Sequence, residues 1–299
     1  MAQRTARGPG GPVMLDAVLA AVAAAALFAV AAALQHRSAG LVGPGPGAAP
    51  DQGGLVALTG RTMRHPLWIT GALASLAGLG LHALALRDGP LTLVQPLLVT
   101  GVIFALPLRQ ALERLRPRPA ELAWAAALAL GLAVFILAAT PAGSPAQPAD
   151  PRPALICAAA IGLGLPACVT ASRRATGAPA ALALGTAAGL AFAGTAGLLK
   201  QVTNELSHGA GALLTTWPSY ALLVAGGLGL LLSQLAYRAG PLRASLPAVT
   251  AVNPIASLVI GVAVFDERFR GGAPYLAAEA LGLALIVVAA VGLTRSGPR

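Results

Sequence analysis

Two stretches of the chain, LALRDGPL at residues 84–91 and LAYRAGPL at residues 235–242, are identical at six of eight positions. They begin 151 residues apart in a chain of 299 residues. Each stretch places a Gly-Pro pair after an apolar run, which is typical of a tight turn between two helices. The same offset pairs Gly78-Leu79 with Gly229-Leu230, Pro96 with Pro247, and Leu130–Ala133 with Leu281–Ala284. The sequence therefore predicts an internal repeat.

The first helix of each half matches at a different offset. FAVAAALQH at residues 28–36 corresponds to FAGTAGLLK at residues 192–200. Each half therefore contains four related helices, with one unrelated helix between the halves. Chance similarity between apolar segments explains Ala and Leu matches more readily than it explains matched Arg, Gly and Pro residues.

Composition places these helices in a membrane. The chain is 57% hydrophobic and 10% charged, with a mean hydropathy of +0.76, whereas a soluble domain carries about 25% charged residues. A bilayer core is crossed by about 20 predominantly apolar residues. We expect an all-α, polytopic membrane protein with about nine spans: 14–34, 67–86, 91–108, 120–140, 154–171, 178–199, 216–237, 242–265 and 274–293.

The odd number of spans determines the expected arrangement. Four helices return the chain to its starting side, and the connector helix at 154–171 then carries it across. The second half is therefore expected to be inverted in the membrane, as in many secondary transporters. The expected divisions are an N-terminal tail (1–13), a first repeat (14–140) containing a Gly/Pro-rich loop (38–66), a Pro-rich linker (141–153), the connector (154–171), a second repeat (178–293) and a C-terminal tail (294–299).

The loops carry an uneven number of basic residues. Seven Lys and Arg residues lie on the side of the N-terminus and thirteen on the other side. The positive-inside rule then predicts an outside N-terminus and a cytoplasmic C-terminus. Lys200 is the one lysine among nineteen arginines, a bias typical of GC-rich bacterial genomes, so we expect the bacterial inner membrane.

A short acidic and basic run follows the eighth expected span, VFDERF at residues 264–269. Together with repeated helices, and with short third and eighth spans entered through a small turn, it resembles the drug/metabolite transporter superfamily. Members commonly end the corresponding helix with Gly-Glu-Arg. Glu267 and Arg268 match its last two residues, and Asp266 replaces the glycine. The resemblance covers nearly the whole chain and implies an EamA-like permease.

Within that superfamily, the layout is most similar to the NIPA-type magnesium transporter branch. The shared features are nine spans, a long loop after the first helix, VQPLLV at residues 94–99, and Lys200. That branch carries a Gly-Glu pair in its second span, where this chain reads Gly80-Leu81-His82.

Few polar side chains enter the apolar spans, and ionisable ones there are functional candidates. His82, Gln95 and Glu279 are expected in the outer third of the bilayer, with Lys200 near the outer surface. Glu279 lies about 9 Å into its helix at 1.5 Å per residue, where a titrating acid could couple transport to protons. The alternatives are interhelical hydrogen bonds for His82 and Glu279, and snorkelling of Lys200 to the headgroups.

Asn253-Pro254 lies near the middle of the eighth expected span, and Gln234 and Tyr237 near the inner end of the seventh. Pro254 cannot donate a hydrogen bond to the carbonyl of Thr250. That carbonyl and the Asn253 amide could contact a polar substrate, or the proline could form a packed kink. The charged residues at 266–270 are interpreted as a solvated loop.

The leading hypothesis is a permease for a small metabolite or drug, driven by protons or by exchange. Alternatives are a magnesium or other cation transporter and a non-transporting scaffold. The expected partners are a small-molecule substrate and the lipid bilayer, with a homodimer left open and no nucleic acid. No catalytic constellation is present, and the histidines lack metal-ligand spacing. We therefore expect no enzyme, cofactor or metal site.

Overall fold

The computed structural model describes residues 12–42, 64–101, 103–104, 107–108, 111, 118–138, 149–206, 209, 211–240, 242–268 and 272–296. These residues are overwhelmingly α-helical, and none of them is in a strand, so the predicted all-α class is confirmed. The helices are α1 (Pro12–Val42), α3 (Pro66–Asp88), α4 (Leu91–Leu98), α6 (Pro119–Ala138), α7 (Pro151–Arg173), α8 (Ala178–Leu206), α9 (Ala212–Thr215), α10 (Trp217–Ala239), α11 (Leu242–Phe265) and α12 (Ala273–Ser296).

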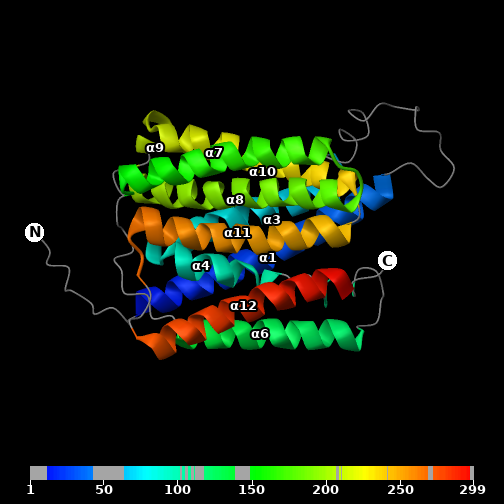
Figure 1. Cartoon of the computed structure of the whole chain (residues 1–299), viewed down its shortest axis with the longest axis horizontal. Helices are drawn as coiled ribbons and strands as arrows, with labels where there is room; N and C mark the ends of the chain where they lie inside the picture. The colour runs from blue at the N-terminus through cyan, green and yellow to red at the C-terminus, as the bar shows by residue number, and fades with distance from the viewer. Residues whose placement is uncertain are drawn as a thin grey trace, which may run out of the picture.

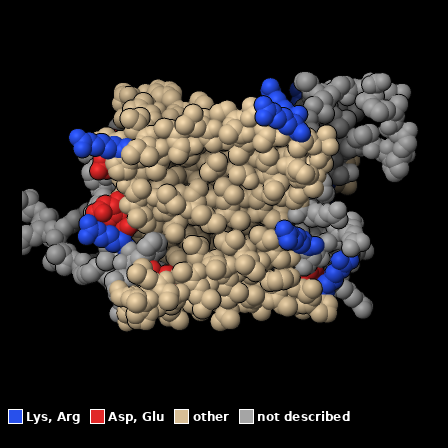
Figure 2. Space-filling model, viewed as in Figure 1, with Lys and Arg blue, Asp and Glu red and all other residues tan. Residues whose placement is uncertain are grey.

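Eight of these helices are long and apolar enough to cross a membrane. They lie side by side along one direction (Figure 1). Figure 2 shows Lys, Arg, Asp and Glu gathered at the two ends of the bundle, with an uncharged belt between them on this face. Large apolar side chains such as Leu137 and Leu163 are 81% and 73% exposed, as expected for surfaces that contact lipid. The chain is a multi-pass membrane protein.

The third expected span, 91–108, differs from the prediction. Helix α4 ends at Leu98, and residues 99–100 form a turn. Pro96 has no N–H to donate, and the Thr100 hydroxyl donates to the carbonyl of Leu97 at 2.6 Å. Residues 101, 103–104 and 107–108 are again helical, and the positions between them lie outside the described residues.

Several expected boundaries also move. Helix α1 continues to Val42, so the predicted loop 38–66 begins as helix, and α7 begins at Pro151, inside the predicted linker 141–153. Asp150 caps α7 by accepting a hydrogen bond from the Arg152 N–H at 3.0 Å, and Pro151 occupies the first turn, where its missing N–H costs nothing. Residues 1–11, 43–63, 139–148 and 297–299 lie outside the described residues. They include most of the predicted N-terminal tail and of the two predicted linkers, and half of the predicted C-terminal tail.

The two repeated stretches end equivalent helices. Helix α3 ends at Asp88 and α4 begins at Leu91; α10 ends at Ala239 and α11 begins at Leu242. The predicted interhelical turns are therefore confirmed. The glycine of each turn packs closely against the first helix of its own half: a Cβ on Gly89 would lie 2.8 Å from Ala17 Cβ, and one on Gly240 would lie 3.1 Å from Ala181 Cβ.

A second contact also occurs once in each half. Gly78 of α3 packs against the Phe28 ring of α1, and Gly229 of α10 packs against the Phe192 ring of α8. A Cβ added to either glycine would lie 2.9 Å from the nearest ring carbon. Phe28 and Phe192 are 164 residues apart, and the two glycines are 151 apart. These are the two offsets at which the halves match in sequence.

Helices α6 and α12, the last of each half, pack against each other through reciprocal contacts. Gly131 lies against Gly282 and Ile286, and Gly282 lies against Gly131 and Phe135. Gly292 lies against Trp124, near the opposite end of the pair. Because residue numbers rise along one helix as they fall along the other, α6 and α12 are antiparallel (Figure 1). Glycine permits this approach because any side chain would meet the facing backbone.

Candidate functional site

The site begins where the chain turns back at the end of α11. Asp266 adopts a left-handed conformation with φ 49°, which aspartate tolerates better than most residues. The following N–H, of Glu267, donates to the carbonyl of Gly261 at 3.1 Å. This turn directs the Glu267 side chain into the bundle. A Cβ on Gly261 would lie 2.5 Å from Glu267 Oε2 and 2.8 Å from Thr92 Cγ2, so glycine is required there.

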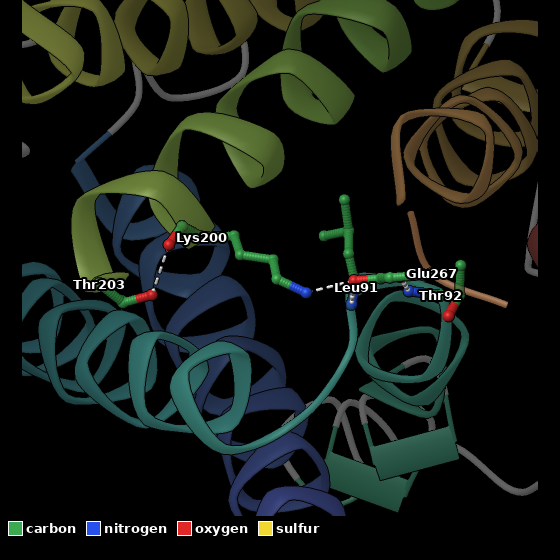
Figure 3. A network of polar contacts seen from close by, with 5 residues as sticks. All are labelled: Leu91, Thr92, Lys200, Thr203 and Glu267. Carbon is green, nitrogen blue, oxygen red and sulfur yellow. Dashed lines mark hydrogen bonds and ion pairs between the residues drawn. The ribbon is translucent and has the colours of Figure 1, made fainter. Parts of the chain in front are cut away.

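The Glu267 carboxylate occupies the N-terminus of α4. Its two oxygens accept hydrogen bonds from the N–H groups of Leu91 at 2.6 Å and Thr92 at 2.8 Å. These N–H groups have no partner within the helix, and the helix dipole favours a negative charge there. Glu267 therefore connects the end of α11, in the second half, to the start of α4, in the first half (Figure 3).

Lys200 completes this cluster from α8. Its ammonium forms an ion pair with Glu267 Oε1 and lies 4.9 Å from the centre of the Phe265 ring. The Lys200 and Glu267 side chains are only 1% and 4% exposed. A buried charge is tolerated when it is paired and hydrogen-bonded, and both conditions hold here. We call this cluster of Lys200, Glu267 and the N–H groups of Leu91 and Thr92 the closure.

A second buried polar pair lies about one helical turn further along α4. Gln95 Nε2 is 3.3 Å from His82 Nε2 of α3, and Gln95 is 2% exposed. The His82 ring also meets the Phe28 ring edge to face, with centroids 6.4 Å apart. The predicted interhelical hydrogen bond of His82 is confirmed, and its partner is Gln95.

Helix α11 carries further polar groups at a depth similar to that of Gln95. Glu267, just after the end of α11, binds the start of α4, and Gly261 lies against Thr92, so the two helices run antiparallel. Ser257 is one turn before Gly261, as Gln95 is one turn after Thr92, which places the two at similar depth. Ser257 is buried and donates to Asn253 Oδ1 at 3.3 Å.

Polar side chains of α3, α4 and α11 therefore follow one another inward from the closure. The series is Thr92, Gln95 with His82, and Ser257 with Asn253. Helix α11 continues from Leu242 to Phe265 without a break despite Pro254.

The other predicted residues lie elsewhere. Gln234 is exposed on α10, and its contact with a substrate stays a prediction. Tyr237, one turn on, is half-buried. Glu279 of α12 is 4% exposed and lies about one turn from Gly282, which packs against α6.

Two sequence interpretations are wrong. Lys200 does not snorkel to the headgroups, because its ammonium is buried and paired. Glu267 is not part of a solvated loop, although its neighbours Asp266 and Arg268 are exposed and pair with each other at 3.1 Å. One feature of the sequence could have predicted the Lys200–Glu267 pair. Lys200 is a single lysine in an apolar helix, and a buried lysine requires an acidic partner nearby.

The fold and the closure together define a multi-pass α-helical membrane protein in which a buried, ion-paired carboxylate links the end of α11 to the start of α4. Over 287 residues the chain is 31% identical to a protein of Corynebacterium glutamicum described as "Uncharacterized protein Cgl0250/cg0304", covering 94% of this chain and 96% of that protein. The chain belongs to the same family as that protein. No family model matches the chain, and no solved structure matches it.

Proposed function

We propose that the chain is a secondary transporter, an EamA-like member of the drug/metabolite transporter superfamily, that moves a small metabolite or drug by alternating access. The observation that carries this proposal is the closure. Its helix-terminal hydrogen bonds, made by a carboxylate that Lys200 pairs within the second half, join the two halves at one end of the bundle. The polar series of α4 and α11 begins immediately inside this end.

The proposed architecture is an inverted repeat of four helices, a connector and four helices. Its support is the recurrence of the Gly78–Phe28 contact as Gly229–Phe192, together with the antiparallel, reciprocal packing of α6 and α12. Elements related by a two-fold axis across the helices meet in this reciprocal way. In such transporters the substrate binds between the repeats, near the middle of the membrane.

Alternating access gives each part of the interface a role. While the Glu267 carboxylate accepts hydrogen bonds from the first turn of α4, a substrate has no access from the closure end of the bundle. Separation of Glu267 from α4 opens this end and exposes the amides of Gln95 and Asn253, the His82 ring and the Ser257 hydroxyl to a polar substrate. These neutral groups both donate and accept hydrogen bonds, so an uncharged or zwitterionic polar substrate matches them best.

The proposed orientation places the closure on the outer side of a bacterial plasma membrane. Three arginines with described side chains lie at the closure end: Arg87, Arg152 and Arg268. Six lie at the other end: Arg37, Arg64, Arg118, Arg173, Arg174 and Arg295. The more basic end is expected in the cytoplasm, which puts the C-terminus inside.

Glu279 is the proposed proton carrier. It is buried within α12, beside the α6–α12 contact that joins the two halves. A carboxyl group whose protonation changes the packing of this contact would link proton binding to the movement of one half against the other.

The alternatives have less support. Among the described residues, no group of three or more His, Cys, Asp or Glu side chains is placed to hold a metal ion, and no observation favours cation transport. A scaffold remains the contrasting hypothesis, and the proposal includes neither an enzymatic activity nor binding of nucleic acid.

Transport by purified protein in liposomes tests the proposal. A metabolite panel is first screened by thermal shift, because a ligand that binds only the folded state stabilises it by mass action. Stabilising compounds are then assayed as radiolabelled substrates, with and without a proton gradient. Saturable flux that Asn253→Leu reduces supports the transporter. The absence of flux for every stabilising compound would favour the scaffold.

A further inference from the structure

Helices α7 and α10 both pack along α8 and enclose a cavity of about 400 Å³ that opens at the bundle surface. It is lined by residues of four helices, within 154–165 of α7, 191–201 of α8, 217–228 of α10 and 260–265 of α11. We call it the α7–α10 groove. Gly194 and Gly197 line it on α8, where neither has a side chain to occupy the space.

The lining restricts what can fill the groove. Apart from Gln201, Cys157 and the indole of Trp217, the lining side chains are apolar or absent. An apolar cavity of this kind does not hold ordered water, which needs two to four polar partners. None of the residues of α7 is buried, so this side of the bundle faces the bilayer. The surrounding molecules that match an apolar groove are lipid acyl chains.

The length of the groove also matches an acyl chain. Its stretches on α7 and α10 each extend over eleven residue steps, or about 16 Å at 1.5 Å per residue. That is about half of a hydrocarbon core of about 30 Å, which is the depth of one leaflet. The groove therefore ends near the depth that the chains of a single leaflet reach.

Polar groups gather only at the end of the groove nearest the closure, which Ala154 marks on α7. The amide of Gln201 and the indole of Trp217 line this end. The Asp150 N–H donates to the Val264 carbonyl here at 2.8 Å. Arg152, in the first turn of α7, is exposed beside this end. Tryptophan favours the membrane interface, and an arginine complements a phosphate.

We propose that the α7–α10 groove binds one acyl chain of a phospholipid from the leaflet at the closure end, with the lipid phosphate at Arg152. The acyl chain would lie against α7, α8 and α10 and pass Phe265 near its headgroup end. The Phe265 ring also faces the ammonium of Lys200. This binding does not depend on transport, and so the two proposals can fail separately.

Photo-crosslinking of the full chain in nanodiscs tests the site. The probe is phosphatidylglycerol with a diazirine at the middle of one acyl chain. Crosslinks mapped by peptide mass spectrometry should concentrate in residues 154–165 and 217–228. An even distribution over all lipid-facing helices, including α6 near Leu137 and α12 near Leu281, would overturn the proposal.

Retention of phosphatidylglycerol after detergent extraction, counted by native mass spectrometry, gives a second test. Gly162→Leu fills the groove, because no atom lies within 4 Å of a Cβ there. It displaces about two methylenes, each worth roughly fourfold in affinity, so binding should fall about fifteenfold. The matched control is Gly227→Leu on α10, which is equally open and outside the groove.

Arg152→Gln should weaken phosphatidylglycerol binding and leave the position of the acyl crosslinks unchanged. Equal retention by Gly162→Leu and Gly227→Leu would contradict the groove as the site. Crosslinks in the groove that are insensitive to Arg152→Gln would overturn the headgroup assignment.

Discussion

The closure can be tested by removing its charges singly and together. Lys200→Met removes the ammonium and keeps much of the side-chain volume. Glu267→Gln keeps the shape of the carboxylate but presents an NH₂ group to one of the two α4 N–H groups. The double variant removes both charges at once. These four proteins form a double-mutant cycle that isolates the interaction between the two side chains.

The burial of the Lys200–Glu267 pair determines how much stability each variant is expected to lose. Removing one partner of a buried ion pair costs about 3–5 kcal/mol of stability, because the other charge stays buried without a partner. The hydrogen bonds that remain at the closure reduce this cost, so each single variant is expected to lose about 3 kcal/mol. Replacing both charges costs less, about 2 kcal/mol, because no charge remains buried. The two single losses would add to about 6 kcal/mol, so the expected coupling is about 4 kcal/mol.

Thermal unfolding in a mild detergent measures the effect. At about 2–4 °C per kcal/mol, each single variant should unfold about 6–12 °C below wild type, and the double variant about 4–8 °C below it. The neighbouring pair of Arg268 and Asp266 is the matched control, since its side chains are 72% and 65% exposed. Arg268→Met with Asp266→Asn should change stability by less than about 1 kcal/mol. Additive losses in the Lys200–Glu267 cycle would refute the reasoning.

Four further changes test other parts of the structure. Lys200→Arg should also destabilise the protein in the thermal assay, because a planar guanidinium does not fit a site built around a compact ammonium; wild-type stability would contradict this. Asn253→Leu should express and unfold normally but transport about tenfold more slowly, for the loss of about one hydrogen bond; unchanged flux would remove Asn253 from the substrate path. Glu279→Gln should lose proton-driven accumulation while keeping substrate binding and exchange, and accumulation with normal pH dependence would mean that Glu279 is structural. Gly282→Ala should destabilise by about 1–3 kcal/mol through overpacking against the Phe135 backbone, whereas Gly227→Ala, in open space, should be neutral in the same measurement.

The sequence predicted the helices well because their signals are local. Long apolar runs, Gly-Pro turns and the repeat of LALRDGPL all act within a few residues, and the corresponding helix ends agree with them. The interruption of the third expected span was not predicted, because hydropathy continues through Val99 and Thr100. The backbone there changes to shorter-range hydrogen bonds, from the Val99 N–H to the Pro96 carbonyl at 3.2 Å and from the Thr100 N–H to the Leu97 carbonyl at 3.0 Å.

The closure could not be predicted in the same way. Lys200 and Glu267 are 67 residues apart, and Glu267 is 176 residues from Leu91. Its burial depends on one left-handed residue, Asp266, and on the missing side chain of Gly261. Neither feature is visible in the hydropathy of the sequence. The charged run at 264–269 was therefore interpreted from its composition alone, as a solvated loop. Gln95 and His82, only 13 residues apart on consecutive helices, were both identified as candidates.

The distance between the two halves at each end of the bundle tests alternating access most directly. With Cys157 and Cys168 replaced by Ala, one spin-label pair is placed at Arg87 and Arg268, at the closure end, and another at Arg64, just before α3, and Arg295 of α12, at the opposite end. Double electron–electron resonance in nanodiscs then compares wild type with Glu267→Gln, which replaces one of the two oxygens that bind the α4 N–H groups. Breaking the closure should lengthen the first distance and shorten the second in the same fraction of molecules. Single, unchanged distances at both ends in both proteins would contradict the account.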